Sequence, residues 1–243
     1  MNVLKIDSDL NGILLIDKPV GLTSHDVVHK IRRAIGMKRV GHAGTLDPLA
    51  TGLLIVLIGR ATKISQFLTN LSKNYEGTMQ FGIEMDSHDA EGRVVAQRDV
   101  CGITLERVRE VAATFEGDIE QIPPMFSAKK FNGKPLYKFA RRGEVIERQA
   151  NLVTVSKFEI SNLSTDGSSA DFLVYCSKGT YVRTLVHDLG QVLRCGAHLS
   201  ALRRTMIGNF SMANAHSLAE ICTMPRDEID NCLISPHLAM KSP

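Results

Sequence analysis

The sequence lacks any hydrophobic run long enough to cross a membrane, since a spanning helix needs about 20 consecutive apolar residues. Its N-terminus also lacks the charged-then-apolar pattern of a secretory signal peptide. Hydrophobic residues make up 44% of the 243 residues and charged residues 23%, which is ordinary for a globular protein. We therefore expect a cytoplasmic protein with one large domain, or one domain and a small appendage.

Cysteine is scarce and is not arranged in pairs. The chain has five cysteines, an odd number, and none of them belongs to a C-x-x-C motif. The eight histidines show no paired spacing typical of metal ligands, and the chain contains no internal repeat. These absences argue against a disulfide framework, a cysteine zinc site and a repeat architecture. We expect reduced thiols and no metal.

Net charge is small, at +3, but the charges are unevenly distributed. Residues 27–46 carry five basic side chains and no acidic one, and residues 129–148 carry seven basic side chains against Glu144 and Glu147. After Met206 the balance reverses and acidic residues predominate. Two basic segments in a near-neutral chain indicate a groove for a polyanion, although two solvated faces would give the same pattern.

The most informative stretch is residues 41–52 (GHAGTLDPLATG), which holds three glycines, one proline and one acid between a basic helical pattern and an apolar run. Glycine permits positive φ, and Pro48 favours an extended conformation at Asp47. Asp47 is thus predicted to stand on a stiff turn above Leu46, Leu49 and Leu53. A carboxylate held in this way suits a reacting group, but an Asp-Pro turn or a helix N-cap is an equal alternative.

Hydrophobic periodicity predicts strands mixed with helices. We expect strands over residues 12–17, 53–58, 75–83, 152–160 and 171–176. We expect a first helix that Ser24 caps and that ends near Gly36, and further helices over residues 64–71, 104–115 and 179–193. Residues 86–92 fail the calcium-loop pattern, so we expect a hairpin turn or a polar loop near the substrate. Residues 121–148, with prolines, glycines and alternating Lys and aromatic residues, predict an irregular loop that folds onto RNA.

Eight motifs occur in the order found in the bacterial TruB-type tRNA pseudouridine synthases, and the chain resembles that family over roughly residues 12–210. The motifs are DKPVGLTS (17–24), GHAGTLDPLATG (41–52), YEG (75–77), DSHDAEG (86–92), QIPPMFSAK (121–129), GKPLYKFAR (133–141), GTYVR (179–183) and GAHLSALRR (196–204). One such motif would be weak evidence, whereas eight in order are specific.

The resemblance implies a fold and a domain arrangement. It implies a mixed α/β (α+β) catalytic domain over residues 1–210, with a mixed, largely antiparallel sheet flanked by helices and a basic RNA-gripping insertion at about residues 121–150. Family members commonly add a C-terminal RNA-binding domain of the PUA type. Residues 211–243 are too short and too acidic for that small barrel, so we expect a tail in its place.

The resemblance also implies a reaction on a uridine in the T-loop of tRNA, at position 55. The bond from N1 to C1′ breaks, the uracil turns, and C5 joins C1′, with no redox cofactor. Asp47 matches the catalytic aspartate of the family, and Arg183 would pair with it and favour its ionised form. Tyr75 would stack on the uracil; its other suggested role, accepting the C5 proton, suits a phenol of pKa near 10 poorly.

The remaining implied contacts bind the RNA. Lys18 would lie close to Tyr75 and Asp47, Tyr181 and Leu202 would line the pocket, and His42 would fill the stack that the flipped uridine leaves. The basic residues expected to hold phosphates are Lys30, Arg33, Arg39, Lys129, Lys130, Arg141 and Arg142. We expect a monomer whose partner is the tRNA T-arm stem-loop, with no membrane and no small-molecule cofactor.

Two other functions fit parts of the pattern. A non-catalytic RNA-binding or RNA-folding module on the same scaffold would bind tRNA without Asp47 and perform no chemistry. An aspartyl-phosphate enzyme is suggested faintly by the sequence from Asp47 to Gly52, but the sequence shows neither magnesium-binding carboxylates nor a nucleotide loop. The sequence leaves open whether Asp47 attacks C1′, attacks C6 or abstracts a sugar proton.

Overall fold

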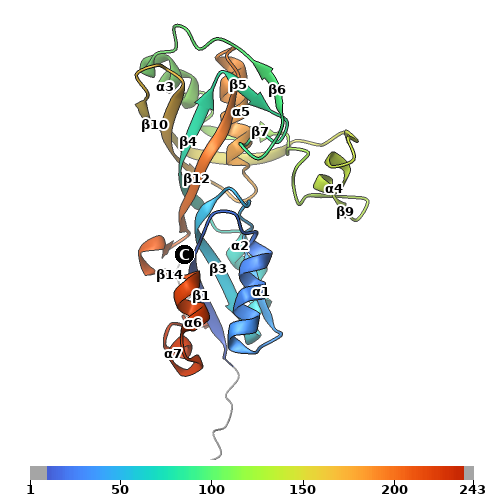
Figure 1. Cartoon of the computed structure of the whole chain (residues 1–243), viewed down its shortest axis with the longest axis vertical. Helices are drawn as coiled ribbons and strands as arrows, with labels where there is room; N and C mark the ends of the chain where they lie inside the picture. Colours follow the sequence, from blue (N-terminus) through green and yellow to red (C-terminus); the bar gives the residue numbers. More distant parts are fainter. Residues whose placement is uncertain (1–9, 238–243) are drawn as a thin grey trace, which may run out of the picture. The chain divides into compact units, whose positions relative to one another are not determined.

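The structure is a computed structural model, and it describes residues 10–237. The chain divides into two compact units, shown in Figure 1. Unit 1 comprises Met1–Leu71 and Arg204–Pro243, and unit 2 comprises Ser72–Arg203. The fold is mixed α/β with a large, mostly antiparallel sheet and flanking helices, which confirms the predicted fold class. No helix within residues 10–237 is long and apolar enough to span a membrane.

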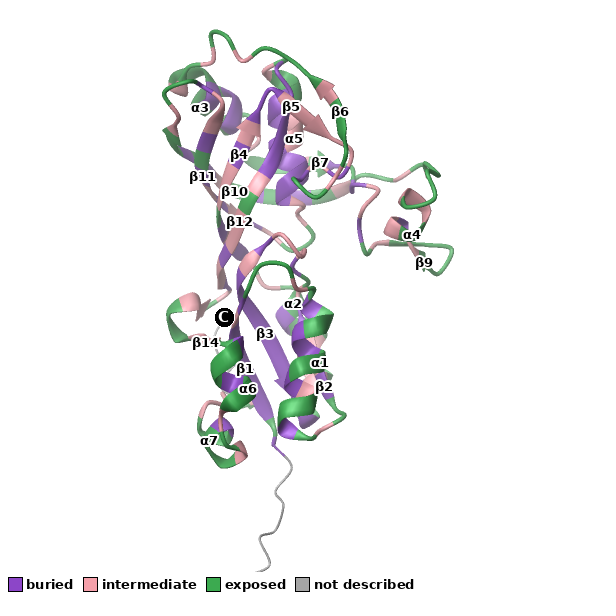
Figure 2. Cartoon of the chain, in the orientation of Figure 1, coloured by how far each residue is buried: buried purple, intermediate pink, exposed green. Residues whose placement is uncertain are grey.

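Unit 1 is built on two fully buried strands. β1 (Gly12–Lys18) runs antiparallel to β3 (Thr51–Ile58), with a register from Gly12↔Ile58 to Lys18↔Gly52. β2 (Val40–Ala43) pairs with the other part of β3, and β14 (His216–Ser217) runs parallel to β1. Because both strands are apolar almost throughout, both faces of this sheet must be covered. Figure 2 shows β1 and β3 buried beside the exposed outer face of α1.

Helices and short elements complete unit 1. They are α1 (Ser24–Ile35), η1 (Gly59–Ile64), α2 (Ser65–Thr69), β13 (Phe210–Ser211), η2 (Met212–Asn214), α6 (Leu218–Thr223) and α7 (Arg226–Asn231). The core includes Ile13, Leu15, Leu53, Ile55 and Leu57, each with at most 2% of its surface exposed. Burying these aliphatic side chains contributes about 1.5–3 kcal/mol each to folding.

The N-terminus of α1 differs from the prediction that Ser24 caps it. Thr23 is the N-cap, because Asp26 stands three residues later and completes a capping box: Thr23 Oγ1 accepts from Asp26 N at 3.1 Å, and Thr23 N donates to Asp26 Oδ2 at 2.9 Å. Ser24 is instead the first helical residue and is buried. The predicted end at Gly36 is confirmed, since Gly36 adopts φ 68°.

Unit 2 has an antiparallel sheet of five strands in the order β12-β4-β11-β10-β7. Their bounds are β4 (Lys73–Phe81), β7 (Gly117–Gln121), β10 (Asn151–Leu163), β11 (Ser169–Cys176) and β12 (Ala197–Ile207), the last of which continues into unit 1. The predicted hairpin is confirmed as β10–β11. Tyr75, Met79 and Phe81 alternate along β4 and are buried, as their spacing predicts.

The other elements of unit 2 are β5 (Ile83–Met85), β6 (Val94–Gln97), α3 (Leu105–Ala113), which packs on β10, and α5 (Val182–Val192). The segment predicted to be irregular holds a small hairpin, β8 (Lys130–Phe131) with β9 (Lys134–Pro135), followed by α4 (Leu136–Ala140). The prediction missed them because these elements are very short. Leu136 is buried, and the rings of Phe131 and Phe139 meet edge to face at 6.1 Å.

Candidate active site

Asp47 lies in the turn between β2 and β3, in unit 1. The turn needs glycine at both ends, because Gly44 has φ 82° and Gly52 has φ 95°. Within it, Asp47 O accepts from Ala50 N at 3.1 Å, and Leu46 and Ala50 are buried. The structure thus places Asp47 on a turn, as predicted, with Leu46 and Leu53 buried and Leu49 half-buried, and we call residues 44–52 the Asp47 turn.

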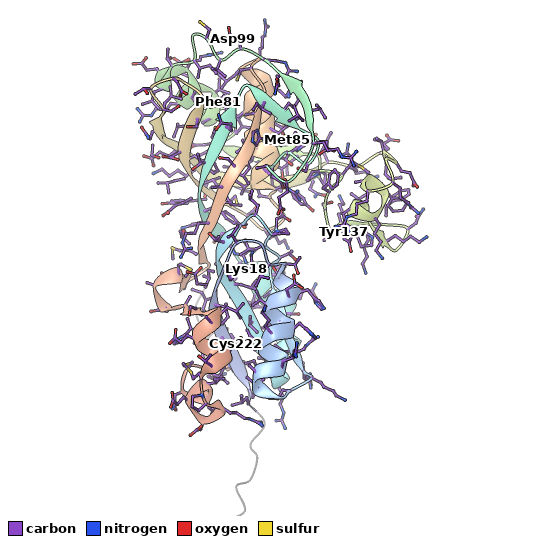
Figure 3. The ribbon with its side chains drawn as sticks, viewed as in Figure 1. Lys18, Phe81, Met85, Asp99, Tyr137 and Cys222 are labelled. Atoms are coloured by element: carbon purple, nitrogen blue, oxygen red, sulfur yellow. The ribbon has the colours of Figure 1, made fainter. Side chains whose placement is uncertain are left out.

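Lys18, at the end of β1, joins the Asp47 turn to the turn that follows β1. Its ammonium is fully buried and donates to Pro19 O at 2.9 Å, to Leu22 O at 2.7 Å and to Pro48 O at 3.4 Å. A second link is the hydrogen bond from Gly21 N to Pro48 O at 2.8 Å. Figure 3 labels Lys18 at this end of β1. The charge of Lys18 is thus held beside the residue that follows Asp47.

Two more buried side chains hold the Asp47 turn. Ser24 Oγ accepts from Leu46 N at 2.8 Å and donates to Leu46 O at 3.2 Å, which ties the first turn of α1 to this backbone. Arg204 donates from Nη2 to Gly44 O at 3.0 Å, from Nη1 to Thr45 O at 3.4 Å and from Nε to Leu53 O at 2.8 Å. The sequence alone did not single out Arg204; its place at the end of the GAHLSALRR motif was the available signal.

His42 lies on β2, two residues before Gly44. Its ring is largely buried, and its Nδ1 atom has no hydrogen-bond partner among the described residues. Burial lowers the pKa of His42, and the charge of Arg204 acts in the same direction. Both causes favour the neutral imidazole of His42.

Arg183, in the first turn of α5, belongs to unit 2, and its partners there are on the turn over residues 86–92. The buried guanidinium donates from Nη1 to Asp89 Oδ2 at 2.9 Å and to Ser87 O at 3.3 Å, and from Nη2 to Phe126 O at 2.5 Å. Asp89 also accepts from Ser87 Oγ at 2.6 Å. Sequence reasoning missed Asp89, because a polar turn ending in Gly92 is usually solvated.

A polar row on α5 continues from Arg183. His187, one turn along the helix, stacks on His88 with ring centroids 3.8 Å apart and an interplanar angle of 4°. Burial lowers the pKa of His88 to about 3, with smaller effects from His187 and Arg183. Burial also raises the pKa of Asp188 to about 6. The stack joins α5 to the residue before Asp89, so it supports the Asp89–Arg183 pair.

Tyr75, Tyr181 and Leu202 also belong to unit 2. Tyr75 lies on β4 opposite Val174 of β11 and has 8% of its surface exposed. Tyr181 is the N-cap of α5, and its backbone is clamped by Gln121, which accepts from Tyr181 N at 2.7 Å and donates to Tyr181 O at 3.1 Å. Leu202 is half-buried on β12. Thus Asp47, His42 and Lys18 come from one unit, and these residues with Arg183 come from the other.

The basic residues expected at the RNA backbone are mostly exposed. Lys30 and Arg33 lie on the solvent face of α1, and Arg39 donates from Nε to Thr62 Oγ1 at 3.0 Å. Around α4, Arg141 lies 5.5 Å from the Tyr137 ring and Arg142 lies 5.2 Å from the Phe139 ring. Figure 3 labels Tyr137 in this segment. Lys130 is exposed, and Lys129 donates to Asn151 Oδ1 at 2.7 Å.

Metal ligands do not gather in the part of the chain that the structure describes. Residues 10–237 contain no group of three or more His, Cys, Asp or Glu side chains that could hold a metal ion. The Asp47 turn itself brings one carboxylate, and two buried cations, Lys18 and Arg204, hold its backbone.

Sequence comparison finds two family models that together span most of the chain. The model for the N-terminal domain of TruB family pseudouridylate synthases matches residues 32–182, and that for the C-terminal domain of tRNA pseudouridylate synthase B matches residues 183–237. The tRNA pseudouridine synthase B of Opitutus terrae is 51% identical over 96% of both chains. The protein of the same name from Pseudomonas aeruginosa is 49% identical over 89% of this chain and 70% of its own length.

Solved structures agree with the sequence relatives. A chain of the crystal structure of a Cbf5–Nop10–Gar1 complex matches with a TM-score of 0.74 and 27% identity, over 95% of this chain and 61% of that one. A chain of an archaeal box H/ACA sRNP Nop10–Cbf5 complex matches with a TM-score of 0.70 and 26% identity, over 96% of this chain and 62% of that one. The chain thus spans about three fifths of these structural neighbours.

Proposed function

The chain belongs to the TruB family of tRNA pseudouridine synthases, enzymes that isomerise a uridine of tRNA to pseudouridine, and we propose that its target is the T-loop uridine at position 55. We further propose that Asp47 is its reacting carboxylate. The observation that carries this proposal is the Asp47 turn, whose backbone is fixed by three buried side chains, those of Lys18, Ser24 and Arg204. Such fixation favours a reacting group over a solvated charge, because a reacting group must be held in one geometry.

The reaction asks three things of the protein. The N1–C1′ bond must break, the uracil must turn while it is held, and the C5–C1′ bond must form as the C5 proton leaves for solvent and N1 takes up a proton. Substrate and product are isomers, so no electrons are gained or lost. Asp47 supplies the carboxylate, and the Lys18 ammonium, bound to Pro48 O beside it, favours its ionised form. We propose no choice between attack at C1′, attack at C6 and removal of a sugar proton.

Residues of unit 2 hold the base in this proposal. Tyr75 stacks on the uracil, which is worth roughly 1–3 kcal/mol for each stacked base. Tyr181 and Leu202 line the same pocket, and the clamp of Gln121 on the Tyr181 backbone supports a fixed position for that ring. Arg183 acts on Asp47 as a cation. Its pairing with Asp89 keeps the guanidinium in one orientation, which suits a residue that must present its remaining donor to a carboxylate.

Base flipping gives a role to His42 and to the basic residues. Extruding a uridine from a folded loop costs a few kcal/mol, and a neutral imidazole can fill the vacated stack. The cations on α1 and around α4 then hold the T-arm backbone, with Lys30, Arg33, Arg39, Lys129, Lys130, Arg141 and Arg142 as the contacts. We propose that residues 1–210 form the catalytic part, with a gripping segment at about residues 121–150.

Tritium release from uracil C5 tests this function. The wild type is mixed with a T-arm stem-loop that carries C5-tritiated uridines, and with a control stem-loop whose target uridine is replaced by cytidine. We expect multiple turnovers that release one tritium for each target RNA and none from the control. Tight binding without release, from this RNA and from full-length tRNA, would support a non-catalytic RNA-binding module. Equal release from the control would refute the T-loop target.

A further inference from the structure

Arg204 is the most unusual buried side chain of unit 1. It has 1% of its surface exposed, and its hydrogen bonds all go to backbone carbonyls. No ion pair joins Arg204 to an acidic side chain anywhere in residues 10–237. Removing a guanidinium from water without a carboxylate partner costs several kcal/mol, which three carbonyl contacts only partly offset. A buried charge that costs free energy of folding is expected to have a function.

The three acceptors lie on both sides of Asp47 in the chain. Gly44 and Thr45 come before it and Leu53 after it, so one guanidinium fixes the entry and the exit of the Asp47 turn. The hydrogen-bonded pairing of β2 with β3 ends at Ala43↔Ile55, and Arg204 bridges the carbonyls just beyond that pair. The planar guanidinium reaches these carbonyls with three separate nitrogen atoms, whereas a lysine would bring all its donors to a single nitrogen on a shorter head group.

The charge of Arg204 is not neutralised by a neighbour. Burial lowers the pKa of His42, and the charge of Arg204 acts in the same direction. Arg183 differs, because Asp89 balances its charge at 2.9 Å. Arg204 therefore adds positive potential to the backbone that carries the single carboxylate of the Asp47 turn, and a nearby positive charge favours the ionised form of a carboxylate.

We propose that Arg204 is a positioning residue for the pseudouridine reaction: it holds the Asp47 turn in its reacting geometry and supplies the unbalanced charge that keeps the Asp47 carboxylate ionised. This inference rests on the proposed function of Asp47. The inference has two parts. The hydrogen bonds of the guanidinium, which we call the fork of donors, should determine the reaction rate, and the charge should determine the acid limb of the pH profile.

Paired variants separate these statements. Arg204→Lys keeps the charge and loses the fork, whereas Arg204→Met loses both. Arg107, on α3, is exposed and pairs at the surface with Glu110 at 3.0 Å, so Arg107→Lys and Arg107→Met are the matched controls. The measurements are single-turnover tritium release from the T-arm stem-loop over a range of pH, the Kd for the same RNA, and circular dichroism at the assay temperature.

We expect Arg204→Lys to slow single-turnover release about 100-fold, because a displacement of about 1 Å at a reacting group has that effect. Its Kd should stay within about threefold of wild type, and the acid limb of its pH profile should not move. Arg204→Met should be slower still, and its acid limb should move up by about one pH unit, the lower end of the usual effect of a neighbouring charge. The variants of the exposed Arg107 should stay within about threefold of wild type in rate.

A folded Arg204→Met that reacts within about threefold of wild type would overturn the inference, as would a rate loss matched by an equal loss of RNA binding. A slow Arg204→Met with an unmoved acid limb would overturn the statement about charge. If Arg204→Met does not fold, Arg204→Lys decides, since a wild-type rate there overturns the statement about the fork. A wild type that releases no tritium would overturn the proposed function itself, and this inference with it.

Discussion

The two units each contain a buried arginine, and these two arginines are satisfied in different ways. Arg183 of unit 2 donates to the carboxylate of Asp89 and to two carbonyls, so its charge is balanced within its own unit. Arg204 of unit 1 donates to carbonyls alone. A carboxylate partner offsets part of the field of a buried arginine, whereas an arginine bound only to carbonyls keeps more of its effect on the ionisation of nearby groups.

The side chains around the two arginines also differ, being mainly aliphatic in unit 1 and polar in unit 2. Unit 1 is held together by aliphatic strands that are buried on both faces, into which Lys18 and Arg204 bring charge. Around Arg183, unit 2 has a connected polar row along α5 that includes the His88–His187 stack and Asp188. Unit 1 therefore owes the rigidity of its functional turn to packing around a few charged anchors, while unit 2 owes it to a polar network. Each prediction below breaks one of these arrangements.

The largest expected effect on the free energy of unfolding comes from removing the carboxylate that pairs with Arg183. Asp89→Asn keeps the shape of the side chain but leaves a buried guanidinium without its carboxylate, which should lower the free energy of unfolding by about 3–5 kcal/mol. Urea unfolding measures it. Asp166→Asn is the control, because Asp166 is exposed and bonds only to nearby serines. A loss below about 1 kcal/mol would contradict the account, and the double variant Asp89→Asn/Arg183→Met should recover part of the loss.

Acid should destabilise the protein through His88. Its pKa is about 3 in the folded state and 6.5 by default, so the unfolded chain binds more protons between these values and stability falls as pH falls through that window. From pH 7 to pH 5 the loss from His88 is at most about 2 kcal/mol. The raised pKa of Asp188, about 6, acts in the opposite sense, so the wild type alone is not a clean test.

The variant His88→Asn isolates this contribution, since Asn tolerates the positive φ of 67° at this position. We expect its free energy of unfolding to fall less than that of wild type between pH 7 and pH 5. His29→Asn, on the exposed face of α1, should retain the wild-type dependence on pH. Identical pH dependence in wild type and His88→Asn would show that the stacked histidines do not carry the effect.

The smallest effects compare helix caps in the two units. Thr23 caps α1 within a capping box, while Thr104 caps α3 through a hydrogen bond to Arg107 N at 3.2 Å. Each change to Ala should cost about 1 kcal/mol in unfolding free energy, and Thr23→Ala should cost more because it removes two hydrogen bonds of Thr23 Oγ1, one accepted from Asp26 N and one donated to Asp26 Oδ2. Thermal and urea unfolding measure the difference. An equal or reversed order would show that the two side-chain hydrogen bonds of Thr23 add nothing to α1 beyond a simple cap.

Much of the fold follows from the sequence, because the strands and the longer helices carry strong apolar periodicity. The buried run of β3, the alternation of β4 and the end of α1 at Gly36 are examples. The N-cap of α1 was misassigned since Thr23 and Ser24 are both good caps, and only the reciprocal bond to Asp26 distinguishes them. The hairpin and the helix in residues 130–140 were missed because strands of two residues and a helix of five are too short to show a hydrophobic repeat.

The site was only partly predictable for a different reason. The glycines and the proline around Asp47 indicate a fixed turn locally, so Asp47 could be found. Arg204 and Asp89 could not, because a charged residue in a strand or a polar turn is usually solvated, and burial depends on what packs against it. Their partners lie far away in the sequence, at Gly44 and at Arg183. Long-range contacts of this kind have no local signature.

The most direct test of the central claim is single-turnover tritium release by Asp47→Asn, with RNA binding measured in parallel. Asn preserves the size of the side chain and its place on the turn but removes the charge. We expect the rate to fall by at least about 10⁴-fold, the loss typical of an essential catalytic carboxylate, while the Kd for the T-arm stem-loop stays within about threefold. If Asp47→Asn keeps more than about a tenth of the wild-type rate, Asp47 is not the reacting group.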